Sequence, residues 1–159
     1  MAGSIITILL LIGCVAMSPT IPLELQYKSP TGHENSLVSL VGSQEKRTLF
    51  GNFTVYTLAV DGKRVMTGPE NWNKTLTIEP GTCNLTVAFL SATLNTQVDL
   101  QLHAVAGSNY QIQFSTDARF FGTSTYCDFW IIDLATQKPV TGVKRGNLIF
   151  SIQYSPSID

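Results

Sequence analysis

Three cysteines and two histidines are the side chains of this sequence best suited to metal or nucleophilic chemistry. They are Cys14, Cys83, Cys127, His33 and His103. A zinc site needs several such ligands at compact spacing, and the sequence contains neither a CxxC nor an HxxH pair. GxSxG, GxGxxG and P-loop patterns are also missing. The spacing therefore predicts no metal, no cofactor and two solvated surface histidines.

Catalysis by acid–base or nucleophilic groups would need partners that the sequence does not bring together. A nucleophilic thiol or hydroxyl needs a neighbouring base. At Cys127 the next residue is Asp128, whose carboxylate would raise the thiol pKa rather than lower it. Four carboxylates could pair only if the fold converges on them: Asp61, Glu70, Glu79 and Asp99. We therefore expect a protein that is not an enzyme, with a small hydrolase as the least favoured alternative.

The N-terminus carries the most specific chemical pattern. Residues 5–12 form an apolar run interrupted only by Thr7, which is too short to span a bilayer but suits a signal peptide. The run leads into Leu11-Ile12-Gly13-Cys14. This segment resembles the lipobox of bacterial lipoproteins, in which an aliphatic residue, a tolerant position and a small residue precede the cysteine that is lipidated.

The lipobox resemblance implies a domain order and a location. Residues 1–13 would be the signal peptide, residues 14–20 a tether carrying acyl chains such as palmitate on Cys14, and residues 21–159 the folded domain. Attached acyl chains hold a domain at a membrane. Val15, rather than Asp, after the lipidated cysteine favours the outer membrane, so we expect a lipid-anchored envelope protein facing the periplasm.

A second interpretation of the N-terminus keeps export and omits the lipid. Cys14 and Ala16 satisfy the small-x-small rule for an ordinary leader cut after Ala16, and no basic residue precedes the apolar run. The protein would then be secreted without an anchor. Its N-x-[ST] sequons would be open to glycosylation, at Asn52, Asn73 and Asn84.

The two remaining cysteines allow two interpretations. Once Cys14 is lipidated, Cys83 and Cys127 form an even pair, which in an exported protein predicts a disulfide. The alternative is a pair of buried free thiols, because unpaired cysteine is commonly a small core residue.

Composition excludes one class of partner. The 159 residues include 10 Lys and Arg against 11 Asp and Glu, with 44% hydrophobic and 13% charged residues. This balance suits one folded domain with a substantial core. A phosphate-backbone binder needs clustered cations, which the sequence lacks, so we expect no nucleic-acid partner.

Period-two alternation of apolar and polar residues extends along most of the chain and predicts strands. The expected strands are 21–28, 36–41, 53–60, 63–66, 76–79, 83–89, 98–104, 110–114, 129–134 and 147–154. Turn residues separate them: Asp61-Gly62 predicts a hairpin, Pro80-Gly81 a type II turn, and 106–108 a hairpin between 98–104 and 110–114. Trp130 is expected in the core. The pattern predicts an all-β fold, a single antiparallel β-sandwich (Ig-like or transthyretin-like) of about eight or nine strands.

Turn chemistry and alternation together resemble a known module. The segments Val60-Asp61-Gly62-Lys63-x-Val65, Leu76-x-Ile78-x-Pro80-Gly81-x-x-x-Leu85-x-Val87 and Ala106-Gly107-x-x-Tyr110-x-Ile112 carry the similarity. They resemble PEGA-type and carboxypeptidase-regulatory-like β-sandwich modules over about residues 50–140. The resemblance implies a sandwich without catalytic residues, in an envelope-associated, adhesive or accessory role.

One loop has the composition of a binding surface. Trp72 lies between Asn71 and Asn73, and a loop tryptophan beside amides could stack on a sugar or anchor a partner protein. The alternative is a tryptophan that folds back over the sandwich edge. Residues 120–122 and Tyr126 form a second aromatic cluster. We expect a non-enzymatic envelope module that binds another envelope protein, with a carbohydrate-binding module as the alternative.

Overall fold

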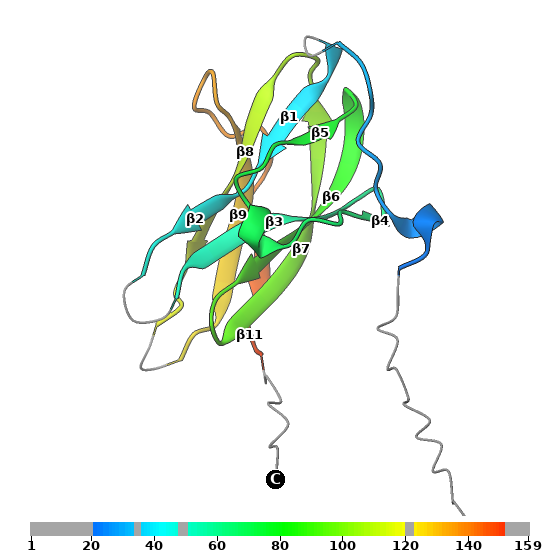
Figure 1. Ribbon diagram of the computed structural model, residues 1–159. Helices are drawn as coiled ribbons and strands as arrows, with labels where there is room; N and C mark the ends of the chain where they lie inside the picture. Colours follow the sequence, from blue (N-terminus) through cyan, green and yellow to red (C-terminus); the bar gives the residue numbers. More distant parts are fainter. Residues whose placement is uncertain (1–20, 34–35, 48–50, 120–122, 152–159) are drawn as a thin grey trace, which may run out of the picture.

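The computed structural model describes residues 21–33, 36–47, 51–119 and 123–151, which form two β-sheets packed face to face (Figure 1). In spatial order, the five-stranded sheet contains β10 (Lys144–Asn147), β9 (Tyr126–Asp133), β8 (Asn109–Thr116), β1 (Val38–Val41) and β5 (Leu76–Ile78). The six-stranded sheet contains β11 (Ile149–Phe150), β7 (Leu94–Ala104), β6 (Gly81–Leu90), β3 (Phe53–Val60) and β2 (Ser43–Glu45), with β4 (Lys63–Arg64) also paired to β3. The predicted all-β class and two-sheet sandwich are confirmed, but the described residues form eleven strands instead of the expected eight or nine.

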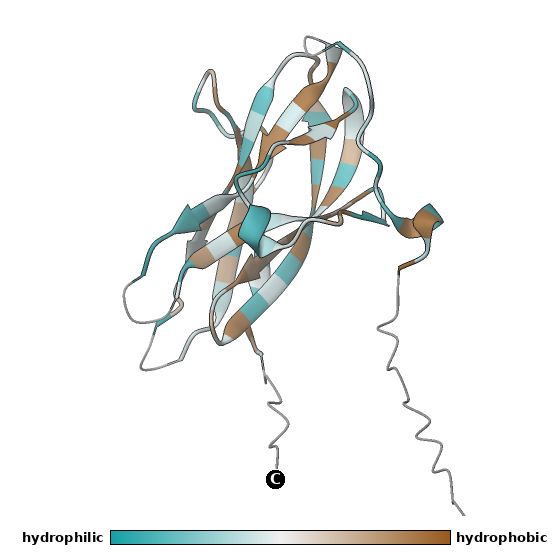
Figure 2. Ribbon diagram, viewed as in Figure 1, coloured by the Kyte–Doolittle hydropathy of each residue, from teal (hydrophilic) through white to brown (hydrophobic). Residues whose placement is uncertain are grey.

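The inner faces of the two sheets form one hydrophobic core. Phe89 of the six-stranded sheet and Phe129 of the other are among its largest fully buried side chains. Phe89 also contacts Phe53 edge-on, with ring centroids 5.4 Å apart, and Phe114 at 5.7 Å. Every second residue of β6 and β7 faces this core, as the alternation predicted. Figure 2 shows hydrophobic and hydrophilic residues alternating along the strands.

The strand connections differ from the prediction in two places. β1 and β8 pair in parallel, with Leu40 opposite Tyr110, so the sandwich is not purely antiparallel. Residues 106–108 do not close a hairpin, because β7 and β8 belong to different sheets. Gly107 N–H instead donates to Leu37 C=O at 2.9 Å as the chain crosses over. Alternation identifies the face that a side chain occupies, but it does not identify the neighbouring strand.

The predicted strand at 21–28 is wrong. This segment contains a short 3₁₀ helix, η1 (Leu23–Leu25), and one isolated bridge from Gln26 to Arg64. Leu23 is 67% exposed and Leu25 52% exposed, so these two apolar residues of the alternation do not face the core, whereas Tyr27 is partly buried against it. The nearest strand, β4, has only two residues and offers too short an edge for an eight-residue strand.

Two further predictions about the second half need correction. Trp130 lies half-buried on the outer face of β9, while its neighbours Phe129 and Ile131 fill the core. The last strand begins before Asn147, as β10, and crosses to the other sheet as β11. Residues 152–154 of the predicted strand lie outside the described part of the chain.

The predicted disulfide between Cys83 and Cys127 is wrong, since both are buried free thiols. Cys83 pairs with Leu102 of β7, whereas Cys127 pairs with Gly146, which lies against Thr96 and Val98 of the same strand. Four to six residues of β7 separate these positions, or about 14–20 Å at strand spacing. A disulfide needs Cα atoms within about 7 Å.

Burial makes both thiols poor nucleophiles, and this predicts slow labelling. Burial raises the pKa of Cys83, with a smaller contribution from Asp61. Burial also raises the pKa of Cys127, followed by the charges of Asp128 and Asp117. In a Cys14→Ser chain without reductant, an aromatic disulfide reagent should label two thiols slowly in native protein and rapidly in denaturant. Recovery of fewer than two thiols in denaturant would contradict this.

Candidate functional site

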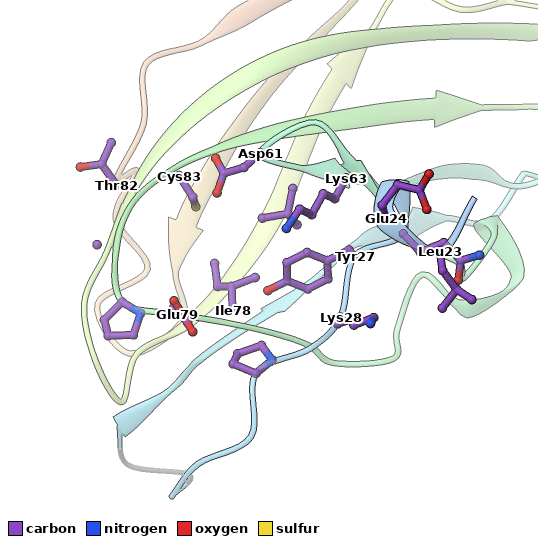
Figure 3. A pocket seen from close by; sticks show the side chains of 15 residues that line it. Leu23, Glu24, Tyr27, Lys28, Asp61, Lys63, Ile78, Glu79, Thr82 and Cys83 are labelled. Atoms are coloured by element: carbon purple, nitrogen blue, oxygen red, sulfur yellow. The ribbon is translucent and has the colours of Figure 1, made fainter. Parts of the chain in front are cut away.

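A pocket of about 550 Å³ opens where the N-terminal segment crosses the sandwich (Figure 3). We call residues 21–30 the strap. The strap forms one wall, the turn from β3 to β4 forms a second, and the crossing from β5 to β6 at residues 78–83 forms the third. Figure 3 shows Tyr27 near the centre, with Asp61 and Lys63 above it and Ile78 and Glu79 to its left.

Tyr27 fastens the strap to both sheets. Its backbone N–H donates to Arg64 C=O at 2.8 Å, and its hydroxyl donates to Thr77 C=O at 3.0 Å. Burial, followed by the charges of Cys83, Glu79 and Asp61, raises the pKa of Tyr27 to about 12. The hydroxyl therefore stays protonated and remains a donor at neutral pH.

The β3–β4 turn fixes the second wall. Asp61 and Gly62 have positive φ values of 48° and 76°, as the predicted Asp-Gly hairpin requires. Asp61 also joins the turn to β6, because its Oδ1 accepts a hydrogen bond from Asn84 N–H at 2.8 Å and its own N–H donates to Asn84 C=O at 2.8 Å. Of the four carboxylates considered for acid–base chemistry, Asp61 and Glu79 line this pocket.

The third wall is the crossing between sheets. Pro80 forms a bend, and β6 begins at Gly81 with a φ of +124°, a value that favours glycine. The sequence predicted a type II turn at Pro80-Gly81, whereas the structure has a bend at Pro80 that leads directly into β6. This bend directs the chain into the other sheet, because β5 and β6 do not pair with each other.

The pocket has an apolar floor and a rim with charges of both signs. Val60, Ile78 and Cys83 are buried in the floor. Exposed rim residues include the anionic Glu24 and Glu79 and the cationic Lys28 and Lys63, with Asp61 beside them. Such a lining suits an apolar group flanked by charges. It offers no activated nucleophile, because the Cys83 thiol has a raised pKa.

The histidines and the other two carboxylates lie elsewhere. His33 and His103 are exposed, as predicted, and His103 Nδ1 lies 3.1 Å from Thr82 Oγ1. Glu70 accepts from Asn71 Nδ2 at 2.8 Å, and Asp99 accepts from Thr86 Oγ1 at 2.7 Å. Within the described ranges, no three His, Cys, Asp or Glu residues cluster as a metal site would require.

The loop around Trp72 is tightly packed. Residues Pro69–Asn71 form the 3₁₀ helix η3, and Trp72 C=O accepts from Gly42 N–H at 2.7 Å. Trp72 is half-buried and, with Asn71, lines a hollow of about 20 Å³, while Asn73 is exposed. A hollow of this size holds about one water. Ligand contact by these residues stays a prediction.

The second aromatic cluster and the lipidation site fall largely outside the described residues, which exclude Cys14 and residues 120–122. Tyr126 is described. The Arg145 guanidinium lies over its ring at 3.9 Å and donates two hydrogen bonds of 2.7 Å to Asp128. This arrangement joins β9 to β10.

Sequence patterns missed most of the pocket. Tyr27, Lys28 and Ile78 come from segments that looked like ordinary strands, and no local signal showed that they meet. The hydroxyl contact of Tyr27 spans 50 residues of sequence. Only the turn residues Asp61 and Gly81 could have marked the pocket, because turns gather at the ends of a sandwich.

The fold and the pocket together define a two-sheet β-sandwich with an open end pocket. No family model matches the chain, and comparisons with curated proteins and solved structures find no significant match. Among the described residues, no helix has the length and hydrophobicity needed to cross a membrane.

Proposed function

We propose that this protein is a non-enzymatic binding module of a bacterial cell envelope and that the strap pocket receives a segment of another envelope protein. The pocket carries this proposal, through its apolar floor and mixed-charge rim. A peptide supplies the matching chemistry, with an apolar side chain for Ile78 and Val60 and charged neighbours for Lys63 and Glu79. The protonated Cys83 thiol and the structural bonding of Asp61 favour binding over catalysis.

The lipobox resemblance of Leu11-Ile12-Gly13-Cys14 supports attachment to the outer membrane, facing the periplasm. Six residues lie between Cys14 and Ile21, and an extended chain of this length spans at most about 20 Å. The strap begins at Ile21, so a lipid on Cys14 would keep the pocket close to the membrane surface. If Cys14 carries no lipid, the same module would act as a secreted protein.

Site-specific photocrosslinking in the native cells tests the partner. A photoreactive residue replacing Lys63 on the pocket rim should form a discrete protein adduct, whereas one replacing Lys144, which is also exposed but lies on β10, should not. Equal adducts at both positions, or none, would contradict the pocket as the binding site. If no protein adduct forms and the protein binds glycans in a way that Trp72→Ala abolishes, the carbohydrate-binding alternative would be favoured.

A further inference from the structure

β7 has one fully paired edge and one edge that is largely unpaired. β6 pairs with it from Asn95 to Ala104, whereas β11 pairs only with Leu94 and Asn95. β11 then continues past the start of β7, because Ser151 N–H donates to Thr93 C=O at 2.7 Å. β10 lies beside Thr96 and Val98 but forms no ladder with them. Residues 99–104 therefore have no strand on their outer side in the described part of the chain.

The hairpin between β6 and β7 determines which backbone groups point outward. Ser91 N–H donates to Leu94 C=O at 2.8 Å, so the polar backbone groups of Leu94 face β6. Along an antiparallel strand, the backbone N–H and C=O groups of successive residues point alternately to one neighbouring strand and to the other side. The β6–β7 register is unbroken up to Ala104. The N–H and C=O groups of Asp99, Gln101 and His103 consequently point away from β6.

This edge lacks the features that normally block strand addition. Native edge strands are protected by shortness, lysine, proline or bulges. β7 has 11 residues and contains no lysine, proline or glycine, and no bulge interrupts its register with β6. The edge strands β2 and β5 have only three residues each. The β7 edge is thus the best template for an added strand among the described strands.

We infer that the β7 edge pairs antiparallel with β7 of a second copy of this chain, with Gln101 opposite Gln101 at the two-fold axis. This register places Asp99 of each copy opposite His103 of the other, in two symmetric pairs of complementary side chains. A centre at Asp99 would bring two carboxylates together, and like charges directly opposite destabilise a sheet. A centre at Leu100 would place Asp99 opposite Gln101 and give no such pair.

Backbone and side-chain geometry agree with this register. Residues 99, 101 and 103 direct their backbone groups outward, so the pairs about Gln101 are hydrogen-bonded pairs. Leu100 of one copy meets Leu102 of the other, which keeps both cores on the same side of the joined sheet. His103 Nδ1 is hydrogen-bonded to Thr82 Oγ1 within the same chain. The other ring nitrogen, Nε2, is therefore the one that can bond to Asp99 of the second copy.

Sedimentation equilibrium of the full chain, from micromolar to hundreds of micromolar, tests the inference, and a monomer–dimer equilibrium is expected. Gln101→Pro removes an outward N–H without breaking the β6 ladder and should weaken association by about tenfold or more. Gln101→Ala keeps the N–H and should dimerise like the unmodified chain. A monomer at all concentrations, or a Gln101→Pro chain that associates as tightly as the unmodified one, overturns the inference.

Side-chain exchange tests the register separately. Asp99→His and His103→Asp should each weaken the dimer by roughly threefold to tenfold, because each removes both complementary pairs without adding a lysine to the edge. The double variant exchanges the two side chains within each pair, so the complementary contact across the axis returns and the affinity should be restored. If the double variant is as weak as the single ones, the register about Gln101 is wrong. Circular dichroism of each variant confirms that the sandwich is folded.

Discussion

Replacing Gly42 with alanine is expected to destabilise the fold by about 3 kcal/mol or more. Gly42 lies between β1 and β2, where the buried chain passes from one sheet to the other. A Cβ atom at this position would collide with Val55 C=O and lie 2.9 Å from Trp72 C=O. Both neighbours are backbone atoms, so relief requires β3 or the Trp72 loop to move. Urea unfolding monitored by tryptophan fluorescence measures the loss.

Gly142 provides a matched control for this substitution. A Cβ atom built on Gly142 has no heavy atom within 4 Å, and the residue is exposed. Gly142→Ala should change the free energy of unfolding by less than about 0.5 kcal/mol. Equal effects at the two glycines would show that the close approach at Gly42 does not limit stability.

Truncating Phe89 to alanine should cost about 3–5 kcal/mol of unfolding free energy. Phe89 is 1% exposed and contacts Phe53 and Phe114 from opposite sheets, so its loss opens a cavity at the centre of the sandwich. The urea midpoint should fall with little change in the slope of the transition.

Phe150→Ala is the corresponding surface control. Phe150 is 70% exposed on β11, and its removal should cost less than about 0.5 kcal/mol. A loss at Phe89 as small as that at Phe150 would contradict a continuous core between the two sheets. The pair compares the same side-chain truncation at two degrees of burial.

Sequence patterns predicted which face of a sheet each side chain occupies better than they predicted which strands pair with each other. Alternation identified the buried residues of β6 and β7, because a half-buried strand must place apolar residues on one side. The Asp61-Gly62 turn followed from the positive φ that both residues tolerate. Trp130 was misplaced because a strand inside a sheet still has an outer face, and β9 directs Trp130 there.

The pocket and the cysteine pairing depend on contacts between distant segments. The 21–28 alternation has the correct period for a strand, but the short β4 gives it only one bridge, so the segment becomes the strap. Counting cysteines suggested a disulfide, whereas Cys83 in β6 and Cys127 in β9 lie beside well-separated parts of β7, which argues against one. These outcomes rest on which strands meet, and local patterns carry little information about that.

The parallel pair β1–β8 has a consequence for the order of folding. Ser39 and Asn109 are about seventy residues apart in sequence, yet they pair side by side in the five-stranded sheet. Contacts between residues so far apart in sequence slow folding, because the intervening chain loses conformational entropy before the contact can stabilise the fold. During folding, the second edge of β1 stays unpaired until residues 109–111 reach it. Until then, β5 is the only described strand that can pair with Val38–Val41.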